Sequence, residues 1–222
     1  MKKAAMLLIM MVPFLFAPPL CHAGEEGDVG FKIFVKGQDQ IYAFTMDIIR
    51  SVQECRYFVA LNHGKEVHPT DPNDISSGIE KLESARSRMI NWIDSREDDV
   101  SNVAQSFSNA LDDLISYYKL VPKLHKEKKI SLAGLATNKR KTGYEKIRAA
   151  TPLIVRIFFS GDKAKPGLSK ERLRLMLQFC KDTFKSELVE IEKRPAAVME
   201  EPFMSSIFFL KLSLEEAIKE VK

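Results

Sequence analysis

Apolar residues recur at alternating spacings of three and four along the stretch from Ile75 to Val121. A seven-residue rhythm of this length is typical of a helix that packs lengthwise against other helices. The stretch contains no proline between Pro72 and Pro122, and its single glycine, Gly78, lies near its start. Its apolar positions are Ile75, Ile79, Leu82, Met89, Ile93, Val100, Val103, Phe107, Ala110, Leu114, Tyr117 and Val121.

One interruption leaves two interpretations of this stretch open. Residues 94–99 are polar throughout and could cap the start of a second helix. We favour a single long helix over 72–121, bent near Ser95, because the apolar rhythm keeps its register through the polar run.

Two arginines, Arg86 and Arg96, occupy positions that would otherwise complete the ladder. A buried guanidinium is costly unless it is paired or hydrated. Either both side chains reach water along their flexible stems, or they line a polar pocket for an anionic ligand such as a carboxylate. Trp92 could form an apolar wall of such a pocket, although a lone tryptophan is usually a core residue. The candidate ligand-binding residues are therefore Arg86, Arg96 and Trp92.

Helical spacing also occurs before and after the ladder. One helix is predicted from Asp39 to about residue 62, followed by a loop over 65–73. A second begins at Ala136 or Thr142 and ends at Phe159, with a kink or a start at Pro152. A third is capped by Ser169 and stops before residue 195. The apolar face of the first helix consists of Ile41, Phe44, Ile48, Val52, Cys55 and Val59.

The C-terminal tail is ambiguous. Pro202 suits the first turn of a helix that runs to Val221. Alternatively, residues 207–210 form a short buried strand, and Ser213 caps a final short helix. We favour the single helix.

These patterns predict an all-α domain over residues 39–222. We expect an antiparallel bundle of four to five helices with one long central helix. Residues 24–38 precede it as a short extended N-terminal arm, because Val29, Phe31, Ile33 and Val35 alternate with smaller or polar residues.

The first 23 residues resemble a cleavable secretory signal peptide. Lys2 and Lys3 precede an apolar run over 4–17, and the small residue Ala23 lies at a suitable cleavage point. A transmembrane anchor would need about 20 apolar residues, and this run is shorter and is broken by Pro13. Lipidation of Cys21 is disfavoured because bulky residues and prolines precede it. We expect a periplasmic or secreted bacterial protein without a transmembrane anchor.

Two cysteines, Cys55 and Cys180, remain after cleavage. Paired cysteines are common in oxidising compartments, and the two predicted helices that carry them are neighbours in an up-and-down bundle. We therefore predict a disulfide bond between them, with two buried free thiols as the alternative.

Charge is unevenly distributed along a nearly balanced chain. The net charge of +4 falls to +2 without Lys2 and Lys3, which gives no reason to expect a nucleic-acid partner. Residues 66–113 nevertheless carry eleven acidic and four basic residues, whereas residues 119–148 carry ten basic and two acidic residues. This segregation reflects complementary solvated helix faces, or it marks a basic patch for an anionic partner such as an envelope protein or an anionic surface.

No sequence motif for catalysis or for a cofactor occurs, so we predict no cofactor. His63 and His68 lie near several carboxylates but match no zinc spacing. We therefore expect an exported interaction or ligand-binding protein of the bacterial cell envelope. The alternatives are an enzyme assembled from distant residues, with a metal at His63 and His68, and a structural or chaperone-like helical protein.

Overall fold

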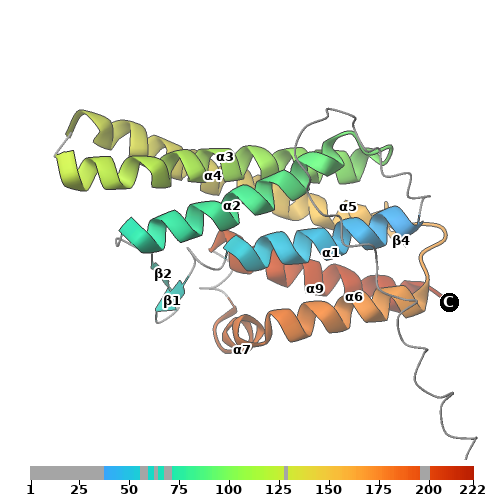
Figure 1. Cartoon of the computed structure of the whole chain (residues 1–222). Helices are drawn as coiled ribbons and strands as arrows, with labels where there is room; N and C mark the ends of the chain where they lie inside the picture. The colour runs from blue at the N-terminus through green and yellow to red at the C-terminus, as the bar shows by residue number, and fades with distance from the viewer. Residues whose placement is uncertain (1–37, 56–59, 63–64, 68–71, 128–129, 196–200) are drawn as a thin grey trace, which may run out of the picture. The chain divides into compact units, whose positions relative to one another are not determined.

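A computed structural model of the 222-residue chain describes residues 38–55, 60–62, 65–67, 72–127, 130–195 and 201–222. These residues are mostly helical, and their helices pack together (Figure 1). The expectation of a mostly helical fold is therefore confirmed. The predicted signal peptide lies outside the described residues, and so does the predicted arm except for Gln38, which begins the first helix.

Helix α1 (Gln38–Cys55) is shorter than the helix that we predicted. Part of the expected C-terminal end instead forms strand β1 (Ala60–Asn62), which pairs in antiparallel register with β2 (Lys65–Val67).

The predicted single helix over 72–121 is wrong, because the chain forms two helices there. Helix α2 (Pro72–Ile93) and helix α3 (Asp98–Glu127) are separated by a short connection, and Figure 1 shows α3 folding back along α2. The hydroxyl of Ser95 accepts a hydrogen bond from the backbone N–H of Glu97 at 3.1 Å. Asp98 and Asp99 then occupy the first turn of α3, where carboxylates are favourable.

The second half of the chain begins with a short turn, η1 (Ile130–Leu132), and helix α4 (Ala133–Ala150). Pro152, where we predicted a kink or a helix start, lies in η2 (Thr151–Leu153), which separates α4 from α5 (Ile154–Phe158). Strands β3 (Phe159–Ser160) and β4 (Lys163–Ala164) then form a second small hairpin. Gly161 has a φ of 63° in its turn, a conformation that favours glycine.

Three helices complete the described chain. Ser169 caps α6 (Lys170–Thr183) as predicted, but the expected single helix is interrupted at Phe184 and continues as α7 (Lys185–Lys193). The tail forms the single helix that we favoured, α9 (Pro202–Glu220), and Pro202 lies in its first turn. With these breaks, the described residues contain more helices than the four or five that we expected, and none spans the whole ladder.

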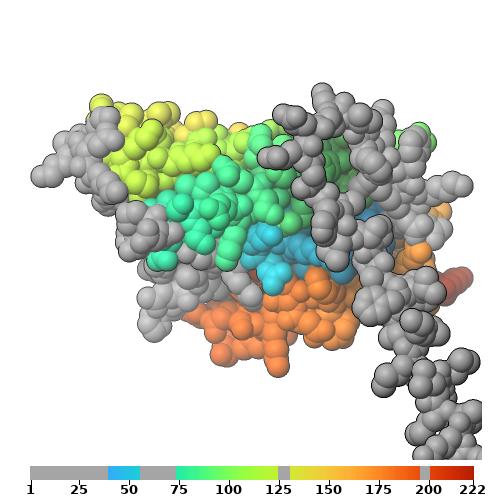
Figure 2. Space-filling model, viewed as in Figure 1, coloured from blue at the N-terminus to red at the C-terminus, as the bar shows by residue number. Residues whose placement is uncertain are grey.

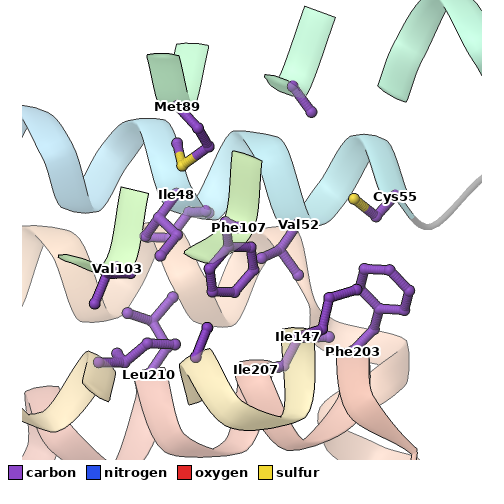
Figure 3. Close-up of a cluster of buried hydrophobic side chains, with 14 of the residues drawn as sticks. Ile48, Val52, Cys55, Met89, Val103, Phe107, Ile147, Phe203, Ile207 and Leu210 are labelled. Carbon is purple, nitrogen blue, oxygen red and sulfur yellow. The ribbon is translucent and has the colours of Figure 1, made fainter. Parts of the chain in front are cut away.

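The helices share one hydrophobic core. Its side chains come from every helix from α1 to α7 and from α9. Figure 3 shows part of it, where Ile48, Met89, Phe107, Ile147 and Ile207 converge from five of these helices. On the face in Figure 2, side chains of α1, α2 and α3 adjoin one another without a gap between the helices. Most ladder residues lie in this core, so the rhythm identified the buried face of both α2 and α3.

Buried hydroxyl groups also connect the helices. The Thr151 hydroxyl lies 2.9 Å from the Ser206 hydroxyl, and each oxygen is also within hydrogen-bond distance of a carbonyl four residues earlier. One hydroxyl donates to the other, and the second donates to its carbonyl. Small hydroxyl side chains therefore let α9 approach η2 without unpaired polar groups.

Candidate functional site: the basic surface of helix α4

The three residues proposed as a ligand site have different surroundings. The guanidinium of Arg86 forms an ion pair with Asp112 of α3, and its side chain is 37% exposed. Arg96 is exposed in the connection between α2 and α3. The two arginines therefore lie on different elements, one bridging two helices and the other exposed at a chain reversal.

Trp92 belongs to the core between α1 and α2. Its ring is buried and meets Phe44 edge-on, with the ring centroids 5.5 Å apart. The indole N–H donates a hydrogen bond to Asp47 at 2.8 Å. Because a buried indole N–H normally needs such a partner, these contacts account for the tryptophan as a structural residue.

Cys55 and Cys180 are free, buried thiols, so the disulfide bond that we predicted is absent from the structure. Their neighbours explain the difference: Cys55 lies beside Arg88 of α2, whereas Cys180 lies beside Lys211 and Glu215 of α9. Burial raises the pKa of the Cys180 thiol to about 12 and also raises the pKa of Cys55. Neither thiol is ionised at neutral pH, and the thiolate is the reactive form.

The proposed metal site at His63 and His68 lies outside the described residues. Within the ranges that the structure describes, no group of three or more His, Cys, Asp or Glu side chains is placed to hold a metal ion. None of the helices in those ranges combines the length and apolar content needed to cross a membrane.

The basic segment that we identified between residues 119 and 148 overlaps helix α4. Helix α4 carries five basic residues and one acidic residue, a net charge of +4. In contrast, α6, α7 and α9 together carry eight basic and eight acidic residues. The basic residues of α4 are Lys139, Arg140, Lys141, Lys146 and Arg148. We call this set the basic surface of α4.

The position of α4 depends on Gly143. A Cβ atom at this residue would lie 2.9 Å from Cγ of Leu114 and 3.2 Å from the carbonyl oxygen of Ala110. Contacts this short leave no room for a side chain, so glycine permits α4 to pack closely against α3. This close approach lies beside Asp113, the residue before Leu114.

Asp113 is the carboxylate that connects the basic surface to α3. Its side chain is only 8% exposed, and its two oxygens accept from two lysines of α4. Lys139 Nζ lies 2.7 Å from Oδ1, and Lys146 Nζ lies 2.5 Å from Oδ2. Burial raises the pKa of Asp113, but the two ammonium groups outweigh this effect and hold the pKa below its ordinary value.

Arg140 lies over aromatic rings of both helices. Its guanidinium carbon is 6.0 Å from the centre of the Tyr117 ring on α3 and 5.8 Å from that of Tyr144 on α4. Tyr144 in turn meets Phe203 of α9 edge-on, at 6.1 Å between centroids. These cation–π contacts hold an exposed positive charge at a defined place on the surface.

Sequence reasoning found the basic segment but missed Asp113. Nothing in the sequence singles out Asp113 from its neighbour, yet Asp113 is buried whereas Asp112 pairs with Arg86. One signal was available: Lys139 and Lys146 are seven residues apart, so they share a helix face and could meet one acidic group.

Comparisons with protein-family models, with curated proteins and with solved structures found no match for this chain.

Proposed function

We propose that the protein is an exported, non-enzymatic interaction protein of the bacterial cell envelope. It is built as an antiparallel helical bundle, and it binds an anionic surface through the basic surface of α4. The observation that carries the proposal is the net charge of +4 on this one helix. The features at the start of the sequence support export, since residues 1–23 have the three parts of a signal peptide.

Some of the basic residues of α4 form ion pairs within the protein. Asp113 is shared by Lys139 and Lys146, and Glu145 lies 3.8 Å from Lys141 on the same helix. A helix with five basic residues and one acidic residue would attract an anionic partner.

The test is binding of the purified mature protein to lipid vesicles with and without an anionic lipid. We expect binding to vesicles that contain phosphatidylglycerol and none to pure phosphatidylcholine, because each basic residue near an anionic membrane contributes about 1 kcal/mol. Raising the salt concentration from 50 to 500 mM should release the protein, since exposed charges are screened over a few ångströms at high ionic strength.

Two variants with the same change in net charge separate the surface from the overall charge. The first is K139Q/R140Q/K141Q/K146Q on α4. The second, K170Q/R174Q/K185Q/K193Q, removes three lysines and one arginine from α6 and α7. We expect the α4 variant to bind at least tenfold more weakly and the α6–α7 variant to bind within twofold of the wild type. Equal losses, or a wild type that does not bind anionic vesicles, would contradict the proposed function.

A further inference from the structure

Lys139, Lys146 and Asp113 form an ionic cluster where the basic surface of α4 meets α3. One buried carboxylate accepts from two ammonium groups, each on a different oxygen, at 2.7 and 2.5 Å. The carboxylate carries one negative charge and the lysines carry two positive charges, so the cluster keeps a net charge of +1. Because the pKa of Asp113 lies below its ordinary value, this charge persists at neutral pH.

Both lysine side chains remain partly exposed to solvent. Each is 40% exposed, whereas the side chain of Asp113 is 8% exposed. An ammonium group has three donors, so one bond to Asp113 does not use its full donor capacity.

The lysines are also held in a defined position. They are seven residues apart on α4, and Gly143 between them is packed tightly against Leu114 of α3. The two charges are thus fixed to one rigid pair of helices, and this reduces the entropy lost on binding.

We propose that Lys139 and Lys146 form a binding site for a phosphate group, with Asp113 as their fixed counterion. This inference rests on the proposed function and names the chemical group that the basic surface recognises. A lysine ammonium is a common phosphate binder in proteins, where it acts as a compact point charge with several donors. A phosphodiester with one negative charge would balance the net charge of the cluster. The phosphate comes from a lipid headgroup or from a free phosphate compound.

A second cluster in the same protein provides a matched control. Glu215 of α9 accepts from Lys181 of α6 and from Lys211 of α9, each at 3.0 Å and each on a different oxygen. The ionic arrangement is the same, but the helices around it carry balanced charge. The α6–α9 cluster therefore lacks the surrounding positive potential of α4.

The experiment compares K139Q/K146Q with K181Q/K211Q in two binding assays. One assay measures affinity for phosphatidylglycerol vesicles, and the other follows the ³¹P NMR signal of glycerol 1-phosphate. We expect K139Q/K146Q to bind at least tenfold more weakly and K181Q/K211Q to change by less than twofold. Loss of vesicle binding alone assigns the phosphate to a lipid headgroup, and loss in both assays assigns it to phosphate compounds in general.

A second pair of variants covers the case in which K139Q/K146Q does not fold. Asp113→Asn removes the counterion and should strengthen phosphate binding at least threefold at low salt, whereas Glu215→Gln, with the same charge change, should not. Equal effects of the two members of either pair would overturn the proposal. If K139Q/K146Q binds vesicles like the wild type while the fourfold α4 variant does not, the phosphate site is wrong but the proposed function stands.

Discussion

At the scale of single residues, Gly143 decides how closely α4 approaches α3. The glycine lies opposite Ala110 and Leu114, and Leu114 is buried, so it has little freedom to move away. The ion pairs of Asp113 with the two lysines of α4 form beside this contact. A substitution of Gly143 should therefore affect both the packing of the core and the ion pairs at the candidate binding site.

Gly143→Ala should lower the free energy of unfolding by about 1 kcal/mol. Overpacking costs about 1–3 kcal/mol, and the better helix propensity of alanine returns about 1 kcal/mol. The matched control is Gly134→Ala at the start of α4, where an added Cβ would meet nothing within 4 Å. Urea unfolding should show the control unchanged or slightly stabilised. A Gly143→Ala protein as stable as its control would show that the close contact is not constraining.

At the scale of elements, a lysine next to the β3–β4 hairpin stabilises the reversal between α2 and α3. Lys165, just after β4, is 14% exposed and binds Asp99 at 2.8 Å and Glu97 at 3.6 Å. The backbone N–H of Lys165 also donates to the carbonyl of Phe158 at 2.8 Å. The small β3–β4 hairpin thus attaches to the start of α3, far from it in the sequence.

Lys165→Gln should therefore destabilise the protein more than Lys163→Gln. The first change removes a shielded charge from two carboxylates, and a hydrogen bond to a charged group contributes about 1.5–3 kcal/mol. Lys163 is exposed in the same hairpin, where substitutions usually change stability by less than about 0.5 kcal/mol. Thermal or urea unfolding of the two variants measures the difference. Equal stabilities of the two variants would mean that the ion pairs of Lys165 do not stabilise the reversal between α2 and α3.

The same element shows what sequence patterns could and could not predict. The spacing of Met89, Val103 and Phe107 identified the buried faces correctly, because burial follows helical periodicity. The reversal between α2 and α3 was missed because the apolar rhythm kept its phase through the polar residues 94–97. The hydrogen bond to Ser95 and the ion pairs of Lys165 stabilise the reversal, and Lys165 is distant in sequence.

The candidate site was predictable only in part. The basic residues of α4 could be counted directly, but the burial of Asp113 depends on the packing of α3 against α4 at Gly143. In the same way, the cysteines lie in the core as expected, but their pairing depends on which neighbouring helix each thiol faces.

At the scale of the whole molecule, buried and partly buried carboxylates link stability to pH. The pKa values of Asp113 and Glu215 lie below their ordinary values of 3.8 and 4.5. Burial raises the pKa of each carboxyl group, but the two lysines beside each group lower it by a larger amount. A carboxylate with a lowered pKa in the folded state contributes stability above its ordinary pKa. That contribution is lost as the pH falls through the folded-state value.

We therefore expect the free energy of unfolding to fall as the pH is lowered below about 4, the ordinary range for these carboxylates. Asp113→Asn should make this fall shallower, because an amide does not titrate. Urea unfolding between pH 2 and pH 7 measures both slopes. A variant that loses stability toward acid as steeply as the wild type would show that the Asp113 carboxylate does not contribute.

At this scale the charge of α4 also contrasts with that of the C-terminal helices. Helix α4 carries a net charge of +4, whereas α6, α7 and α9 together are neutral. The proposed binding of an anionic surface rests on this contrast rather than on the total charge of the chain. It assigns attraction for an anionic surface to one side of the protein.

The most direct test is the ratio of vesicle affinities between K139Q/R140Q/K141Q/K146Q and K170Q/R174Q/K185Q/K193Q at low salt. Both variants lose four positive charges, so the ratio isolates where the charges lie. The account predicts that the α6–α7 variant binds at least fivefold more tightly than the α4 variant. A ratio of one would contradict it.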